Sequence, residues 1–323
     1  MNILVTGGAG YIGSVVTEIL QRRGYKPFVV DNLSIGRRKY VPEDIPFFEN
    51  DIADSDAIAK IIRDNHIDVV MHFAAFALVG ESVENPEKYF TNNIEGTLNL
   101  LKGMKAGGCK RIIFFFFFAV YGNPVKDALD ESHPKNPINP YGYSKLVMEN
   151  CLDWYAQAYG FKYNIFRYFN AAGATALHGE DRDIETHILP ILLQAAFKER
   201  DHFTIFGNDY NTNDGTCIRD YIHVEDLAEA HILGIENMNS HPRAIYNLGT
   251  GNGYSNLQVV NALKEITGMD FEVKYGERRP GDPDMLVAVA TKANQELKWV
   301  PKHSDLKNII ETAFSWKNKL LEK

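Results

Sequence analysis

TGGAGYIG, at residues 6–13, joins the aliphatic run at residues 2–5 to a segment whose apolar side chains recur at helical spacing. In a strand–turn–helix unit with this spacing, Gly7 permits a tight turn and Gly10 lets a phosphate approach the backbone, while Gly13 lets the helix pack on the strand. A plain glycine-rich turn is the alternative. Because the motif follows a strand and opens a helix, we predict a dinucleotide-binding site.

The start of that helix and the end of the next strand specify the dinucleotide. The N–H groups of Tyr11 and Ile12 lie in the first helical turn, where they have no partner within the helix and attract a pyrophosphate. Asp31 ends the second strand. A carboxylate there binds the adenosine ribose hydroxyls and repels a 2′-phosphate. The sequence therefore predicts NAD rather than NADP.

Two neighbouring features leave alternatives open. Arg37 and Arg38 could bind a 2′-phosphate, but Asp31 holds the discriminating position, so we expect them to be surface charges. Asp51 and Ile52 follow the third strand, where an adenine contact would fall. Asp51 is equally suited to cap the next helix.

Strand-like and helix-like segments alternate through the first half of the chain, which predicts an α/β fold with a doubly wound parallel sheet of the Rossmann type. This rhythm breaks near residue 170. We therefore expect an NAD-binding domain over residues 1–170 and a smaller α/β substrate-binding domain over residues 171–323. Segments near 219–235 and 244–250 are expected to return to the main sheet.

Composition limits the class of protein. The 323 residues are 45% hydrophobic and 24% charged, and the net charge of -8 argues against a nucleic-acid partner. The three scattered cysteines suit neither disulfides nor a metal cluster and indicate a reducing compartment. The longest apolar run, residues 112–121, is too short to span a membrane. We expect a cytoplasmic protein that binds no metal, nucleic acid or membrane.

Tyr141 and Lys145 lie four residues apart in a predicted helix, so they share one helical face. An ammonium group near a phenol stabilises the phenolate and favours proton transfer near neutral pH. His72 and His223 could also act as bases or ligands, but no metal-ligand spacing surrounds them and we expect core histidines.

The glycine motif followed by Tyr-x-x-x-Lys resembles the extended short-chain dehydrogenase/reductase family. Further motifs are similar to those of its UDP-glucose 4-epimerases (UDP-galactose 4-epimerases), in register along nearly the whole chain. They are HFAA at 72–75, VGES at 79–82, NN at 92–93, YFN at 168–170, FGNDY at 206–210, RDYIHV at 219–224 and RRPGD at 278–282.

This resemblance implies redox-neutral inversion at C4 of a UDP-hexose through a 4-keto intermediate, an activity of galactose and carbohydrate metabolism. Tyr141 would be the acid/base, with Lys145 activating it and binding ribose. Further NAD contacts would come from Asn32, Asp51, Ile52, Phe73, Ala74, Ala75, Asn93 and Phe169. The UDP-sugar would contact Asn170, His187, Phe206, Arg219, Arg279, Asp282 and Leu286. The family also implies a homodimer formed through the helices that we expect at residues 86–104 and 141–158.

Residues 114–118, FFFFF, depart from the family pattern, which resembles FSSTA. Phe117 stands where the family has a Ser or Thr that hydrogen-bonds the sugar 4-OH, and a phenyl ring cannot do this. Four large rings in place of small residues would also overpack a central strand, at about 1–3 kcal/mol each. A sequencing error, a deliberate change and an impaired enzyme all explain the run; we favour the first.

Two other readings remain. A sugar-nucleotide dehydratase or a UDP-glucuronate decarboxylase would share fold and cofactor, but residues 114–121 contain none of the carboxylates expected for those reactions. A catalytically impaired, NAD-binding homologue is favoured by the phenylalanine run. Turnover of UDP-galactose would distinguish it from an enzyme.

Overall fold

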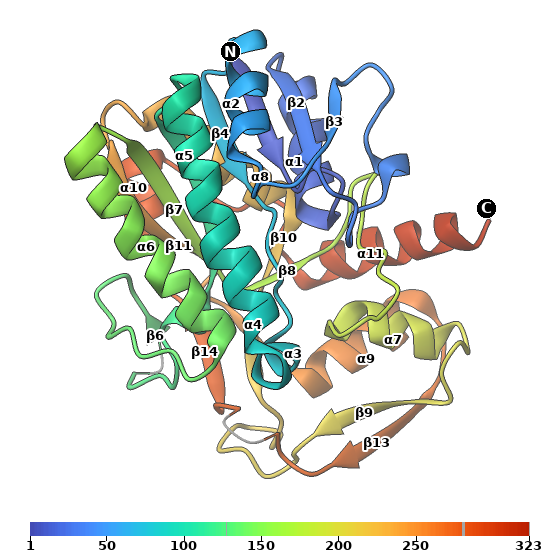
Figure 1. Cartoon of the computed structure of the whole chain (residues 1–323). Coiled ribbons are helices and arrows are strands. Elements are labelled where there is room, and N and C mark those ends of the chain that lie inside the picture. The colour runs from blue at the N-terminus through green and yellow to red at the C-terminus, as the bar shows by residue number, and fades with distance from the viewer. Residues whose placement is uncertain (127, 280–281, 323) are drawn as a thin grey trace.

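The computed structural model describes residues 1–126, 128–279 and 282–322 (Figure 1). Its centre is a seven-stranded sheet in which every neighbouring pair is parallel. In spatial order the strands are β11 (Arg243–Leu248), β7 (Lys162–Tyr168), β5 (Arg111–Phe117), β4 (Val69–His72), β1 (Asn2–Thr6), β2 (Lys26–Asp31) and β3 (Phe47–Glu49). From β1 the chain adds β2 and β3 on one side and then β4, β5, β7 and β11 on the other, so the order of the strands reverses between β1 and β4. Ligands bind at such a switch point, beyond the carboxyl ends of the strands.

Helices cover both faces of this sheet. On one face α1 (Tyr11–Arg22) and α8 (Val224–Asn237) contribute to a single apolar cluster with the strands. The opposite face is covered by α2 (Ser55–Asp64), α5 (Thr97–Gly107) and α6 (Pro140–Tyr159). The predicted doubly wound α/β fold is therefore confirmed.

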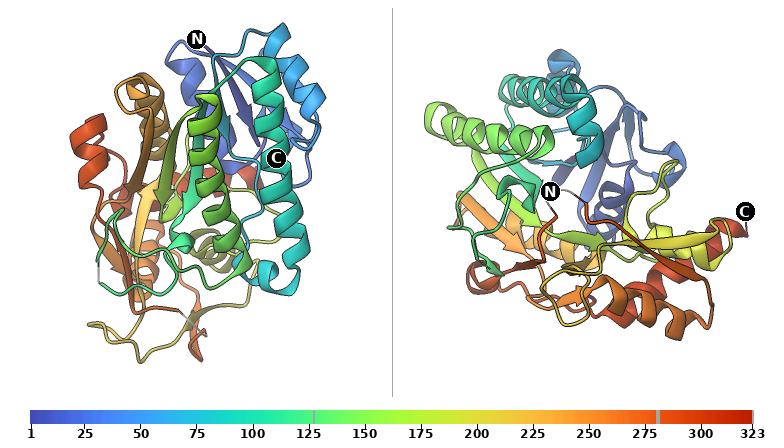
Figure 2. Two further views of the ribbon diagram at one scale, coloured as in Figure 1. Left: turned by 60° about the vertical axis from the view of Figure 1, so that its left-hand side comes forward. Right: turned by 90° about the horizontal axis from the view of Figure 1, so that it is seen from below.

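The later part of the chain builds smaller sheets and a third apolar cluster (Figure 2). One sheet contains β12 (Gly253–Ser255), β10 (Ile218–His223), β14 (Met285–Ala288) and β6 (Ala128–Leu129), with β8 (Asn170–Ala172) also paired to β10. The other pairs β9 (His202–Phe206) with β13 (Glu272–Gly276). Helices of this part are α7 (Ile188–Ala196), α9 (Asn256–Thr267), α10 (Thr291–Leu297) and α11 (Leu306–Leu321).

Two segments were expected to return to the main sheet, and they do so differently. Residues 244–248 pair with β7 as part of β11. Within 219–235, helix α8 packs on the face of the main sheet, but strand β10 pairs with β8, β12 and β14 instead. The prediction for this strand is wrong, because β7 is already paired with β5 and β11.

The stretch expected as one helix over residues 86–104 is interrupted. After α3 (Val79–Glu84), α4 (Pro86–Tyr89) runs into a π-helical segment, Phe90–Gly96, and then into α5. Such widened turns often occur at functional sites. Here the segment carries Asn93, whose side-chain amide bonds both the N–H and the C=O of Phe76 at 3.0 Å.

The first turn of α6 is placed tightly against the end of β5. Asn139 caps the helix by accepting from Gly142 N–H at 2.8 Å, and Pro140 starts it. A Cβ on Gly142 would overlap the carbonyl oxygen of Ala119, so only glycine permits this approach. The result fixes Tyr141 beside the carboxyl end of the central strand. Within the described residues, no helix has the length and apolarity needed to cross a membrane.

Candidate active site

The glycine turn has the geometry that its sequence predicted. Gly7 has φ of +74°, and a Cβ there would lie 2.6 Å from the backbone nitrogen of Ala74. A Cβ on Gly13 would overlap the carbonyl oxygen of Gly7. Gly10 is the N-cap of α1, so the first N–H groups of the helix face the cleft above β1. This cradle can receive a pyrophosphate.

Asp31 is buried at the end of β2, with 7% of its surface exposed. Its two carboxylate oxygens accept from Ala9 N–H at 3.0 Å and Leu33 N–H at 2.8 Å. Burial raises the pKa of this carboxyl group, although both N–H groups act against the shift. The carboxylate is thus held rigidly, with lone pairs left for ribose hydroxyls.

The ambiguous neighbours also have defined partners. Arg37 pairs with Asp181 and Asp183, and Arg38 donates to the Val41 carbonyl at 2.6 Å, so both guanidinium groups are engaged within the protein.

Asp51 accepts from the Asn32 amide at 2.8 Å, while the N-cap of α2 is Asp54. Asp51 therefore does not cap that helix. It lines a shallow hollow that also includes Phe76 and Asn92.

The expected catalytic pair is deeply buried. Tyr141 and Lys145 are each 1% exposed. Burial lowers the pKa of Lys145 to about 7. Burial also raises the pKa of Tyr141; Tyr89 raises this pKa further, and Arg182 lowers it. Within the described residues, the Tyr141 hydroxyl has no hydrogen-bond partner.

The phenylalanine run encloses this pair. The Lys145 amine lies 4.6 Å from the centre of the Phe115 ring and 5.7 Å from that of Tyr141. The Phe117 ring stands edge-on to Tyr141 at 6.3 Å, and Phe118 stacks on Phe169 at 5.3 Å. Strand alternation sends Phe115 into the core on one face of the sheet and Phe114 and Phe116 into the core on the other.

The two ends of the expected dinucleotide site therefore differ in how well they suit NAD. The glycine cradle and Asp31 fit the pyrophosphate and the adenosine ribose. At the nicotinamide end, the Lys145 amine lies among aromatic rings, and the side chains of Phe115 and Phe117 have no polar atom to offer. The Tyr141 hydroxyl is buried, so neighbouring side chains must move before it can contact a ligand.

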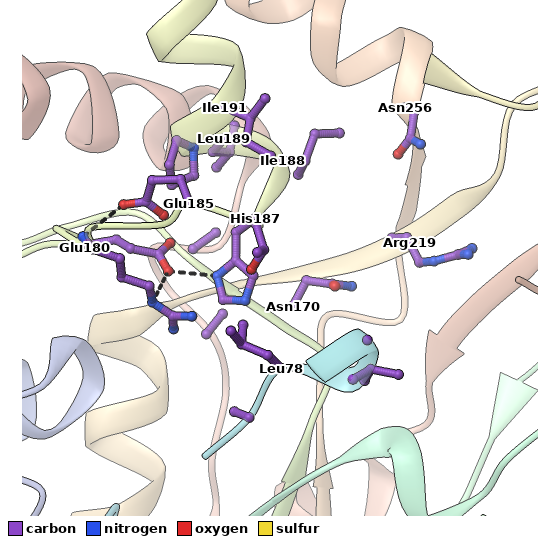
Figure 3. A pocket seen from close by; sticks show the side chains of 18 of the residues that line it. Leu78, Asn170, Glu180, Glu185, His187, Ile188, Leu189, Ile191, Arg219 and Asn256 are labelled. Carbon is purple, nitrogen blue, oxygen red and sulfur yellow. Dashed lines mark hydrogen bonds and ion pairs between the residues drawn. The ribbon is translucent and has the colours of Figure 1, made fainter. Parts of the chain in front are cut away.

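Next to Tyr141 opens a cavity of about 1640 Å³, part of which is drawn in Figure 3. It is lined by every residue expected to contact the UDP-sugar, together with Tyr11 and Phe117. Those residues are Asn170, His187, Phe206, Arg219, Arg279, Asp282 and Leu286. The structure brings them together from β8, the segment before α7, β9, β10 and the chain around β14.

The arginines of this cavity are held in different ways. Arg219 forms an ion pair with Asp282 and donates to the Pro283 carbonyl at 3.0 Å. The Arg279 guanidinium lies 4.3 Å from the centre of the Phe206 ring. Pro280 and Gly281 of the same motif lie outside the described residues. Two guanidinium groups, that of Arg279 beside an aromatic ring, suit a diphosphate attached to a base.

Residues 3–249 match the sequence family described as NAD dependent epimerase/dehydratase. This chain belongs to that family. It is 46% identical to a UDP-glucose 4-epimerase of Lactobacillus helveticus, over 98% of this chain and 97% of the relative. The UDP-glucose 4-epimerase of Brucella ovis, solved in complex with NAD, is 43% identical with a TM-score of 0.94, over 97% of both chains. The Bifidobacterium longum enzyme, solved with NAD+ and UDP, is 35% identical with a TM-score of 0.91, over 99% of this chain and 98% of that one.

In this family member, several charged residues of the cavity were not predicted from the sequence, among them three on one segment. Glu180, Arg182 and Glu185 line the cavity beside His187. Their segment lacks helical or strand periodicity, so no pattern placed them. The density of charge in GEDRDIE, residues 179–185, was the signal that could have drawn attention to them.

The two histidines weighed as bases have internal roles. His72 is 1% exposed, and its ring nitrogens lie 2.7 and 3.1 Å from the hydroxyls of Thr6 and Thr97. Burial lowers its pKa to about 3. His223 accepts from Glu225 N–H at the start of α8. Within the described residues, no cluster of His, Cys, Asp or Glu could hold a metal ion.

Proposed function

We propose that this chain is a cytoplasmic, NAD-dependent UDP-glucose 4-epimerase that interconverts UDP-glucose and UDP-galactose. The observation that carries the proposal is the position of Tyr141 at the wall of the cavity that contains Arg219 and Arg279. The similarity to UDP-glucose 4-epimerases over almost the full length supports it.

The chain's own residues supply binding, orientation and proton transfer. Residues 7–13 and Asp31 would hold the pyrophosphate and adenosine of NAD. NAD bound there would supply reversible hydride transfer to and from C4 of the sugar. Tyr141 would take the proton of the 4-OH and give it back after the 4-ketohexose has turned in the cavity. Lys145 would stabilise the phenolate.

Binding energy in this scheme resides on UDP. Arg219 and Arg279 would hold the UDP moiety, together with Asn170 and His187 of the same cavity. The ring then stays free to turn, because no contact that must persist is made to the sugar itself.

The phenylalanine run sets the rate that we expect. Without a hydroxyl at position 117, the path from the 4-OH to Tyr141 lacks one hydrogen-bonding group, at a cost of about 100- to 1,000-fold in rate. Side chains around the buried Tyr141 hydroxyl must also move before it can contact a ligand. We infer a slow epimerase that retains nucleotide binding.

The test has two measurements. The purified protein is denatured and the released dinucleotide is identified; NAD is expected, and the absence of dinucleotide or the release of NADP would refute the cofactor assignment. Conversion of UDP-galactose to UDP-glucose is then followed with excess protein over long times. The closure around Lys145 favours a second candidate, an NAD-binding homologue without turnover, which requires NAD release together with no conversion at all.

We also propose a homodimer formed through α6 and the π-helical segment beside it. This surface exposes Phe90, Tyr143 and Trp154, and 68% of the surface of Trp154 is exposed. The ring centres of Phe90 and Tyr143 lie 6.2 Å apart. Exposed aromatic groups of this kind mark interfaces. Light scattering should give a molar mass of two chains for the parent and of one chain for Trp154→Glu. A monomeric parent would refute the interface.

A further inference from the structure

A buried carboxylate lies in the wall of the nucleotide cavity, where it would repel an anionic ligand. Glu180 has 8% of its side chain exposed, and its Oε1 lies 2.7 Å from His187 Nδ1 and 2.9 Å from Arg182 Nε. Figure 3 shows the dashed contact between Glu180 and the His187 ring. Both contacts have ion-pair distances but not the angles of hydrogen bonds.

The backbone that carries this carboxylate is fixed by helix α11. Trp316 of α11 donates its indole N–H to the backbone carbonyl of Glu180 at 2.9 Å. A Cβ on Gly179 would lie 2.5 Å from the Trp316 ring, so the backbone packs closely against the indole. Glu180 is therefore held in place independently of its two cationic contacts.

His187 and Arg182 both line the cavity. Arg182 does so together with Tyr11 of the glycine turn and Tyr141. His187 lines the cavity together with Asn170. With Nδ1 facing Glu180, its Nε2 is the ring nitrogen left for a ligand.

We propose that Glu180 is a positioning residue, which holds the Arg182 guanidinium and the doubly protonated His187 ring as paired donors for the diphosphate of a bound nucleotide. The inference rests on the proposed function for the identity of that nucleotide. The diphosphate can belong to the UDP-sugar or to the dinucleotide. Carboxylates orient ligating histidines in the same way at metal sites, where losing the carboxylate weakens binding 10- to 100-fold.

Glu185 offers a matched control. It lies on the same segment, is 9% exposed and lines the same cavity, but its Oε1 accepts from the backbone N–H of Arg182 at 3.0 Å. Burial, with Glu180 second, raises its pKa to about 7. Glu185→Gln thus removes a comparable carboxyl group without releasing the His187 ring or the Arg182 guanidinium.

Whether Glu180→Gln weakens or tightens UDP binding distinguishes a positioning role from a simple effect of charge. Removing a negative charge from an anion site should tighten UDP binding if charge alone matters. If Glu180 positions the donors, Glu180→Gln should instead weaken binding about tenfold, as for the loss of one charge-assisted hydrogen bond. Glu185→Gln should leave the UDP dissociation constant within about twofold of the parent or tighten it.

The measurement is titration calorimetry of UDP with each variant, with the NAD content per chain measured in parallel. Weaker UDP binding with full NAD content assigns the diphosphate to the UDP-sugar, whereas NAD loss with unchanged UDP binding assigns it to the dinucleotide. Either result supports positioning.

A double-mutant cycle with His187→Gln adds a readout that a general folding defect would not move. The effect of Glu180→Gln should shrink when His187 is already replaced. Unchanged or tighter UDP binding with full NAD content, or equal weakening by Glu185→Gln, would overturn the inference. A parent that binds neither UDP nor NAD would instead refute the proposed function.

Discussion

The nucleotide cavity and the end of β5 meet at Tyr141, yet their side chains follow opposite patterns. The cavity carries charged and amide groups among its apolar side chains, with Arg182 and Arg219 beside carboxylates and Arg279 beside an aromatic ring. The end of β5 presents rings only, and they enclose the Lys145 amine. Binding and chemistry therefore depend on separate parts of the site, so a change in one can leave the other intact.

The largest effect is expected when polar or small residues replace the phenylalanines at the end of β5. We expect Phe115→Ser, Phe116→Ser, Phe117→Thr and Phe118→Ala together to raise turnover of UDP-galactose by about 100- to 1,000-fold. UDP affinity should change little, because the arginines lie elsewhere. Intact mass of the parent comes first, since it shows whether the phenylalanines are present. Confirmed phenylalanines with full turnover in the parent would remove the role assigned to the hydroxyl.

The second change tests the point where the two regions meet. In the polar variant, Tyr141→Phe should lower turnover at least about 100-fold, because it removes the acid/base group. The UDP dissociation constant should stay near that of its parent. Tyr143→Phe is the matched control, since this tyrosine lies on the same helix with half of its surface exposed. Equal activity of the two variants would exclude Tyr141 from the mechanism.

The third change measures the closure around Lys145. Its folded-state pKa of about 7 is below the ordinary value of 10.5. Between these two pH values the unfolded chain binds a proton that the folded chain does not, so Lys145 makes folding less stable as pH falls. Lys145→Met should therefore stabilise the protein more at pH 7 than at pH 9, by about 1–2 kcal/mol.

Urea unfolding at the two pH values checks this, with Lys102→Met as the exposed control. The difference should be absent in the control. A Lys145→Met variant with the same pH dependence as the parent would mean that the amine is solvated and charged, and that the rings do not close over it.

Local spacing explains which parts of the site were predictable. The glycine turn, Asp31 and the Tyr141–Lys145 pair each depend on residues close in sequence, so their geometry follows from one strand or one helix. The contact of Glu180 with His187 depends on an irregular segment whose shape is set by packing against Trp316. The pairing of β10 with β8 depends on which edges of other strands were free. Neither leaves a periodic signal in the sequence.

The smallest expected effect concerns the wall of the sugar end. Leu286 lines the cavity with a side chain that is smaller than a tyrosine. A leucine leaves room for a substituent at C2 of the sugar, so UDP-N-acetylglucosamine should compete with UDP for binding. Leu286→Tyr should weaken that competition about fivefold to tenfold, by steric exclusion of the acetyl group. UDP itself should bind as before, and Leu286→Met, which keeps the volume, should behave like the parent. Failure of UDP-N-acetylglucosamine to compete at millimolar concentration would show that Leu286 does not set access. Polar side chains of the cavity, and not Leu286, would then decide which sugar binds. Recognition of the sugar would then depend on the same polar groups that bind UDP.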